Sequence, residues 1–177
     1  MKKIVIIYGL ISGVIISAYM LVTMEIFKDR EDHIESGMLI GYTGMVIALS
    51  LIFFGVKSLR DNQFSGVITF WKATQAGLGI AFIAAIMYAL SWEVSYSRMG
   101  DEFNKKMIEQ YMARIDSNLP ADEAEAEKKQ IIQNFEDYKN PVIRFGMTLM
   151  EIFPVGILIT LISAGLLRKK ELLPASK

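Results

Sequence analysis

The sequence predicts an all-α protein, a four-helix transmembrane bundle that carries an extracytoplasmic helical hairpin between its third and fourth spans. Hydrophobic residues make up 53% of the 177-residue chain and are gathered into blocks. Four of these blocks are long enough to cross a hydrocarbon core of ~30 Å at ~1.5 Å per residue. Basic residues gather at one set of block ends, which is typical of cytoplasmic loops.

The first span is predicted from about residue 4 to residue 27. The chain is uncharged from Ile4 to Met24, a run longer than the apolar region of ~7–15 residues in a signal peptide. We therefore interpret this segment as a span that is not cleaved. Gly9 and Gly13 lie one helical turn apart, and small residues at this spacing let a second helix approach closely. Both are predicted to be helix-packing residues.

The second and third spans are predicted at about residues 37–56 and 70–92. The third span carries the longest stripe of small residues in the chain, and Gly77, Ala81 and Ala85 belong to it. Because only small residues let two helix backbones meet closely, we expect this helix at the centre of the bundle, with these three residues against a neighbouring helix.

Two tryptophans mark the expected ends of the third span. Trp71 and Trp92 are separated by 21 positions, which is ~31 Å along a helix. This spacing fits two indoles anchored at the two membrane interfaces. Thr69 is the expected N-cap of the helix, because its hydroxyl can accept a hydrogen bond from a free N–H group of the first turn.

Residues 95–140 are soluble in character and predict two amphipathic helices that form a hairpin. A Pro-containing break near residue 120 separates the helices, and the acidic residues from Asp122 to Glu127 suit the N-terminal end of the second helix. Glu125 and Lys129 are expected to form an ion pair one turn apart. The apolar faces need cover, which either packing of the helices against each other or a seat on the membrane surface would provide.

The fourth span, predicted at about residues 145–167, contains a carboxylate and a proline. An ionisable group inside a span is costly and usually faces protein or water, so Glu151 is predicted to point into the bundle. Pro154 is expected to kink the helix and to free the carbonyl of Met150. Glu151 is either structural, bonded to another helix or paired with Arg144, or it belongs to a path for protons or ions.

Three residues near the outer ends of the first two spans are candidate partners of Glu151. Tyr42 and Thr43 could each donate a hydrogen bond to it, and we expect Tyr42 to do so first because a phenol reaches furthest. Glu25 could share a proton with Glu151, although its place near the end of the first span favours contact with headgroup water.

The charges segregate by side of the predicted membrane. Basic residues dominate one side, whereas the loops on the other side are rich in Asp and Glu. Basic loops face the cytoplasm, so both termini are expected there and residues 95–140 outside. The cluster of Lys57, Arg60 and Lys72 could also hold an anionic lipid headgroup. The basic side comprises Lys2, Lys3, Lys57, Arg60, Lys72, Arg168, Lys169, Lys170 and Lys177.

Composition disfavours several classes of function. The net charge is zero and the chain has no cysteine, which argues against nucleic-acid binding and excludes thiolate chemistry. His33 lies in an acidic loop, but a single histidine there lacks the fixed geometry that metal ligation needs. No nucleophile motif and no glycine-rich phosphate loop is present. We therefore predict no enzyme activity, no cofactor and no metal.

Three stretches are distinctive when they are taken together in order. They are Gly41–Asp61 (GYTGMVIALSLIFFGVKSLRD), Gly66–Ala73 (GVITFWKA), and Glu151–Gly156 (EIFPVG) followed by Leu161–Ala164 (LISA). This set resembles an uncharacterised bacterial membrane-protein family, one of the domains of unknown function. The resemblance covers nearly the whole chain, the hairpin least well. It implies a four-span protein of the bacterial inner membrane, and it supplies no activity.

We expect a single-domain, non-catalytic membrane protein that acts as an accessory or interaction partner, with the hairpin as its recognition element. Its surroundings are the lipid bilayer, and its candidate partners are another membrane protein or further copies of itself. The alternative is an oligomeric small transporter or channel with Glu151 on the pathway, which needs self-assembly because four spans seldom enclose a pore alone. Polar groups cluster outside the membrane, which favours the accessory role.

Overall fold

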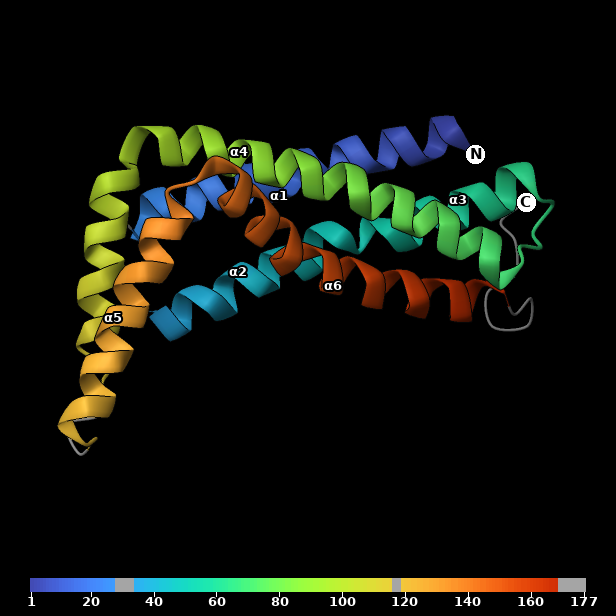
Figure 1. The fold of residues 1–177 in the computed structure, drawn as a ribbon. Helices are drawn as coiled ribbons and strands as arrows, with labels where there is room; N and C mark the ends of the chain where they lie inside the picture. Colours follow the sequence, from blue (N-terminus) through green and yellow to red (C-terminus); the bar gives the residue numbers. More distant parts are fainter. Residues whose placement is uncertain (28–33, 116–118, 169–177) are drawn as a thin grey trace. The chain divides into compact units, whose positions relative to one another are not determined.

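A computed structural model describes residues 1–27, 34–115 and 119–168 of the chain. These residues form helices and no strand, which confirms the all-α prediction. The helices are α1 (Lys2–Phe27), α2 (Ile34–Leu49), α3 (Leu51–Gln63), α4 (Phe70–Met112), α5 (Ala121–Tyr138) and α6 (Pro141–Leu167), as Figure 1 shows.

Four segments within the described ranges are long and apolar enough to cross a membrane, which confirms the predicted number of spans. They are Lys2–Ile26, Leu39–Gln63, Phe70–Met112 and Pro141–Leu167. Helix α5 lies between the third and the fourth of them. The protein is therefore a candidate multi-pass membrane protein.

The chain divides into two compact units. The first, which we call the bundle unit, comprises Met1–Ala89 and Leu149–Lys177. The second, which we call the hairpin unit, is Leu90–Thr148. Each unit is described below by itself.

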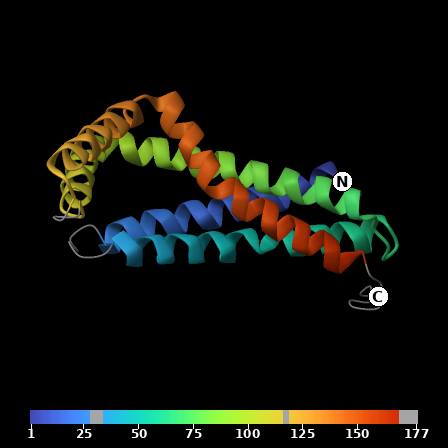
Figure 2. The ribbon, with the colours of Figure 1, turned by 60° about the horizontal axis from the view of Figure 1, so that its bottom comes forward.

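In the bundle unit, α1 lies along α2 and α3 (Figures 1 and 2). An interior of aliphatic side chains holds these helices together with α4 and α6. Burying such side chains contributes roughly 25 cal/mol per Å² of apolar surface relative to water, although lipid lowers this gain for spans that associate within a membrane. The largest fully buried apolar side chains are Ile16, Met45, Leu49, Ile52, Leu59, Ile80, Ile152 and Leu167.

The second span is interrupted at Ser50, between α2 and α3. The Ser50 hydroxyl donates to the carbonyl of Ile47 at 2.6 Å, a local bond that competes with regular helix geometry. Close to the break, the buried hydroxyl of Ser12 on α1 donates to the carbonyl of Ala48 at 2.7 Å. The interruption is therefore stabilised by a polar contact from a neighbouring helix. The sequence predicted one helix here and did not indicate the break.

Helices α4 and α6 meet through small residues. A Cβ added to Gly77 would lie 2.6 Å from Cγ2 of Thr160, and one added to Gly156 would lie 2.9 Å from Cβ of Ala81. These approaches are closer than a real Cβ tolerates, so the two backbones pack here because both positions lack a side chain. Ala81 and Ala85 are both buried.

The α3–α4 connection is a turn in which two consecutive residues have positive φ angles. The N–H groups of Phe64 and Gly66 both donate to the carbonyl of Arg60, at 3.2 and 3.1 Å. Ser65 and Gly66 have φ angles of 51° and 80°, which lie in the left-handed region that commonly closes a helix. The backbone N–H of Lys72 then donates to Oγ1 of Thr69 at 3.4 Å, as the predicted N-cap requires.

Helix α4 is longer than the sequence suggested. The third span was expected to end near Trp92 and a separate soluble helix to follow, whereas α4 runs without interruption to Met112. No proline lies in this stretch, and the single glycine, Gly100, costs a helix interior only ~1 kcal/mol. The first arm of the hairpin is therefore the continuation of a spanning helix, and α5 is the second arm.

Candidate functional site

The most extensive polar cluster in the described part of the hairpin unit is centred on Arg144. This side chain lies in the first turn of α6 and is 5% exposed. Its Nε and Nη2 atoms donate to Oε1 and Oε2 of Glu93 on α4, at 2.9 and 2.5 Å. Two parallel bonds of this kind fix the geometry of both partners, and they are stronger than neutral hydrogen bonds.

The remaining donor of the guanidinium group serves the backbone. Nη1 of Arg144 donates to the carbonyls of Tyr138 and Lys139, at 3.0 and 3.1 Å. These carbonyls lie where α5 ends, and the last carbonyls of a helix lack partners within the helix. Arg144 therefore caps α5 while it is tied to α4. One residue joins all three helical segments of the hairpin unit.

The connection from α5 to α6 is fixed locally as well. The side chain of Asn140 accepts a hydrogen bond from the N–H of Val142 at 2.9 Å, so Asn140 is the N-cap of α6. Pro141 follows as the first helical residue, where its missing N–H costs nothing. The turn that presents Arg144 to Glu93 is thus encoded by the sequence around residue 140.

Aromatic rings surround this ion pair. The Arg144 guanidinium group lies over the Tyr96 ring at 3.7 Å from the ring centroid, a geometry in which the cation is attracted to the π face. Trp92 donates from Nε1 to the hydroxyl of Tyr138 at 2.7 Å. The rings of Tyr96 and Tyr138 meet edge to face, and Phe103 packs against Trp92. The rings cover the guanidinium group, and the lower local dielectric on that side strengthens its attraction to Glu93, which remains 21% exposed.

Asn104 extends the network along α4. Its Nδ2 donates to the hydroxyl of Tyr96 at 2.6 Å, and the residue is 4% exposed. The Oδ1 atom has no hydrogen-bond partner among the described residues. Asn104 is thus held between the aromatic cluster and a shallow pocket of about 300 Å³ on the same unit.

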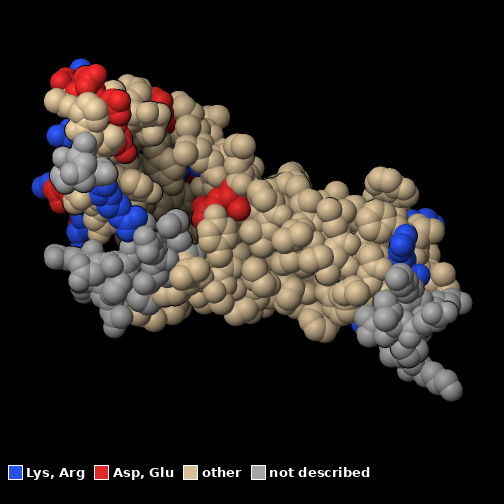
Figure 3. Space-filling model, turned by 90° about the horizontal axis from the view of Figure 1, so that it is seen from below, with Lys and Arg blue, Asp and Glu red and all other residues tan. Residues whose placement is uncertain are grey.

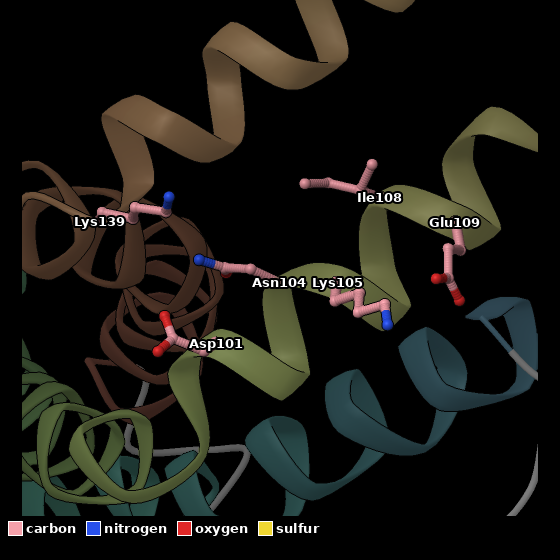
Figure 4. Close-up of a pocket in the computed structure, with 6 residues that line it drawn as sticks. All are labelled: Asp101, Asn104, Lys105, Ile108, Glu109 and Lys139. Atoms are coloured by element: carbon pink, nitrogen blue, oxygen red, sulfur yellow. The ribbon is translucent and has the colours of Figure 1, made fainter.

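That pocket carries charges of both signs. In Figure 4 the side chains of Asp101, Asn104 and Lys139 point toward one another, while those of Lys105 and Glu109 extend away from them. The hydrogen bond from Lys139 to Glu136, with the nearby charge of Asp101, raises the pKa of Lys139 above the ordinary value for lysine. The pocket is open and its charges are largely matched, so we assign it no ligand.

Helix α5 presents a polar surface. None of its residues is buried, and the predicted pair of Glu125 and Lys129 is confirmed, with Nζ and Oε1 separated by 2.8 Å. On its inner side the Phe135 ring packs against Tyr111 of α4 at a centroid distance of 6.0 Å. The two arms of the hairpin thus cover apolar groups with each other, which was one of the two arrangements expected.

Glu151 lies differently from the prediction. Its side chain is exposed rather than directed into the bundle, and no hydrogen bond or ion pair reaches it from any residue within 1–27, 34–115 and 119–168. The expected pair with Arg144 does not form, because Arg144 bonds to Glu93. The physical reason is the phase of α6. Ile152, Gly156 and Thr160 occupy the packed face, which turns position 151 outward.

The expected partners of Glu151 are not assembled around it. Tyr42 is 45% exposed, and the Thr43 hydroxyl donates to the carbonyl of Leu39 in its own helix at 2.7 Å. Glu25 is exposed near the end of α1. Pro154 lies inside α6, which continues through it as one helix. The contacts expected for Glu151 with Tyr42, Thr43 and Glu25 are therefore absent from the described part of the chain.

The predicted packing residues lie at contacts between helices, whereas the two predicted anchors, Trp71 and Trp92, have different surroundings. Gly9 and Gly13 lie against Ile83 and Met87 of α4, at 2.7 and 2.6 Å from an added Cβ, and Gly77, Ala81 and Ala85 are placed as described above. Trp71 is 73% exposed, as an interfacial indole would be. Trp92 belongs to the aromatic cluster of the hairpin unit, and its predicted place at the interface stays a prediction.

The basic cluster near the α3–α4 turn is partly neutralised within the chain. Arg60 is fully buried, and its Nε lies 2.7 Å from Oδ1 of Asp61. Nζ of Lys57 lies 2.8 Å from the other oxygen of Asp61, and Lys72 lies over the ring of Phe64. These contacts leave less charge for a lipid headgroup than the sequence suggested. The metal alternative considered at His33 lies outside the described residues.

Sequence reasoning missed the Glu93–Arg144 pair. A signal was available, since opposite charges stand at the neighbouring ends of two consecutive spans, where a helical hairpin brings those ends together. From the sequence, Arg144 is expected only as a partner of Glu151, and no role is predicted for Glu93. Of the aromatic residues in the cluster, Trp92 is predicted from the sequence as an interfacial anchor.

Comparison with known proteins adds a family and no activity. The chain matches no curated protein and no solved structure. A family described as "Protein of unknown function (DUF4199)" matches residues 7–169, which is nearly the whole chain. The chain therefore belongs to this family of unknown function, as the resemblance noted in the sequence implied.

Proposed function

We propose that this protein is a non-catalytic accessory or interaction protein of the bacterial inner membrane, and that its hairpin unit recognises a partner protein. The observation that carries the proposal is the rigid base of the hairpin, where Arg144 ties α4, α5 and α6 together. Fixing a polar arm in one orientation costs conformational entropy. Such a fixed arm reduces the ordering cost of binding, which is the benefit of preorganisation.

The surface of α5 supports protein recognition more than membrane contact. None of the α5 residues is buried, and the helix carries many charged side chains of both signs. An interfacial helix that lies on lipid usually shows Lys and Arg on its polar face with large apolar residues on the other. The acidic first turn, with Asp122 and Glu123, does not suit an anionic lipid surface. A partner protein with matching charges suits it better.

The proposed orientation places both termini in the cytoplasm and the hairpin outside. In the bundle unit, the N-terminus, the α3–α4 turn and the end of α6 lie together at one end (Figure 1). Lys2, Lys3 and Arg168 belong to these segments, and Lys57 and Lys72 lie on the two helices that flank the turn. A shared end rich in Lys and Arg is the pattern of a cytoplasmic face.

Site-specific photocrosslinking in living cells tests the recognition role. A photoreactive residue at Lys128 or Ile132 should give a discrete heavier product with a second protein species, because both positions are on α5 and Ile132 is 47% exposed. The same residue at Val14, which is 57% exposed on α1, is the control. Absence of any product from the α5 positions, or the same products from Val14, would contradict the proposal.

The alternative of an oligomeric transporter or channel retains one supporting observation, the exposed carboxylate of Glu151 inside a span. Ionisable groups at such positions often mark ion or proton pathways. Reconstituted protein with the native sequence should then conduct protons across vesicles under a membrane potential, and Glu151→Gln should abolish the flux. Equal leakage from both proteins and from empty vesicles would remove this alternative.

A further inference from the structure

One stripe of α6 combines an apolar surface with polar groups that lack partners. Leu158 and Leu161 are 60% and 43% exposed, and Glu151 and Pro154 are exposed on the same stripe. Gly165 continues it, and a Cβ added there would meet nothing within 4 Å. We call these five residues the α6 seam. In Figure 3 the middle of the visible surface has no charged atoms apart from one patch of acidic atoms.

Two polar groups lie on neighbouring residues of this helix. The first is the Glu151 carboxyl group, to which no described residue bonds. The second is the carbonyl of Met150, because Pro154 has no N–H to donate to the carbonyl four residues before it. Met150 is also 77% exposed. Acyl chains offer no donor or acceptor, so contact with lipid alone leaves both groups unsatisfied.

A second copy of the same helix can supply a hydrogen-bond partner to the Glu151 carboxyl group. A carboxyl group has acceptor oxygens and, when protonated, a donor as well, so it can bond to an identical group. A two-fold axis places a residue opposite itself. Gly165 lets two backbones approach closely further along the seam, as small residues do between membrane helices.

We propose that a second copy of this chain packs against the α6 seam, with the two Glu151 carboxyl groups hydrogen-bonded to each other across a two-fold axis. The seam on each copy is the same patch, so the interface is isologous and closes at a dimer. A single polar pair within an apolar helix interface also fixes the register of the two helices, as buried polar residues do in coiled coils. The inference goes beyond the proposed function, because the α6 seam lies in the bundle unit and not in the hairpin unit.

Cysteine crosslinking tests the dimer directly, because the chain contains no cysteine. Leu158→Cys places one thiol on the seam, and Val14→Cys places one on α1 with almost the same exposure, 57% against 60%. On oxidation in native membranes, Leu158→Cys should form a disulfide-linked species of twice the chain mass. Val14→Cys should not. No dimer from Leu158→Cys, or equal dimer from both variants, would overturn the proposal.

Substitution of Glu151 in the Leu158→Cys background then tests the polar pair. Glu151→Gln keeps a donor and an acceptor, so the yield of dimer should hold. Glu151→Leu removes one interhelical hydrogen-bonded pair and should lower the dimerisation constant by about threefold to tenfold. Undiminished dimer from Glu151→Leu would show that the carboxyl group is not the contact. A crosslink only to a heavier, different protein would likewise refute self-association.

The dimer of α6 and the partner of the hairpin unit are tested by separate experiments, so one proposal can fail without the other. The α5 photocrosslinks report a partner of the hairpin unit whether or not α6 dimerises. The mass of the native protein in mild detergent, measured by light scattering, is a second measure of the oligomeric state and needs no substitution. A chain of 19.9 kDa should be found as a dimer, and a monomer over the full range of concentration would contradict the seam contact.

Discussion

Arg144 and Glu93 form a bidentate ion pair across the base of the hairpin unit, with N–O distances of 2.9 and 2.5 Å. The two residues are separated by 51 positions, yet the α4–α5–α6 turn sequence brings them together. Because Arg144 also caps the end of α5, one side chain couples the closure of the hairpin to the start of the fourth span. This coupling is the basis of the first prediction.

Arg144→Met should loosen the hairpin unit. The substitution leaves the Glu93 carboxylate and the carbonyls of Tyr138 and Lys139 without the Arg144 donor. Breaking a buried pair costs ~3–5 kcal/mol, and because Glu93 remains 21% exposed we expect a smaller loss of about 2–3 kcal/mol. Hydrogen exchange of the α5 amides measures it, and exchange should become faster throughout α5.

Two further variants distinguish the loss of the Glu93–Arg144 ion pair from a nonspecific destabilisation of the hairpin unit. Glu93→Leu combined with Arg144→Met removes both charges, so α5 should exchange more slowly than in Arg144→Met alone, since no carboxylate is left unpaired. Lys129→Met breaks the exposed pair with Glu125, for which we expect no measurable change, because exposed pairs contribute little. If the α5 amides exchanged as fast in the double variant as in Arg144→Met, the unpaired Glu93 carboxylate would not be the cause of the faster exchange.

Ser12→Ala should weaken the contact between α1 and the break in the second span. The Ser12 hydroxyl is fully buried and donates to the Ala48 carbonyl. Its removal leaves that carbonyl without this donor, at a cost of about 1 kcal/mol. The midpoint of thermal unfolding in detergent is the measurement. Thr43→Val is the matched control, because the Thr43 hydroxyl is exposed and bonds within its own helix, and it should leave the midpoint unchanged.

The spans could be predicted from the sequence because hydrophobicity alone decides which segments enter lipid. The packing positions on α4 could be predicted as well, since Gly77 and Ala81 follow the helical period and small residues pack in membranes by close backbone approach. These features depend on local composition and on residue spacing, both of which a single sequence shows directly.

The direction of Glu151 could not be predicted in this way. A rule that buries ionisable residues within the chain assumes that the chain is the whole assembly, and α6 instead turns Gly156 and Thr160 toward α4. The break at Ser50 and the pairing of Arg144 with Glu93 depend on residues far apart in the sequence. Such contacts follow from the three-dimensional arrangement and leave only weak traces in spacing or composition.

Reporter fusions should give opposite sides for the α3–α4 turn and for α5. The turn follows Lys57 and Arg60, whereas α5 begins with Asp122 and Glu123. Basic residues beside a span hold a loop in the cytoplasm. A fusion after Arg60 should therefore be active only with a cytoplasmic reporter, and one after Lys128 only with a periplasmic reporter. Activity of both fusions with the same reporter would refute the proposed orientation.

Gly156→Ala should destabilise the bundle unit through a single added methyl group. The new Cβ would lie 2.9 Å from Cβ of Ala81, and neither atom belongs to a flexible side chain that could move away. The helices must separate to accommodate it, at a cost of about 1–3 kcal/mol. Gly146→Ala in the same helix is the control, because its Cβ would meet nothing within 4 Å. Replacing glycine by alanine in an open helical position gains up to ~1 kcal/mol. The two variants should thus shift the unfolding midpoint in opposite directions, and a shift of the same sign and size in both would show that α4 and α6 do not meet at Ala81.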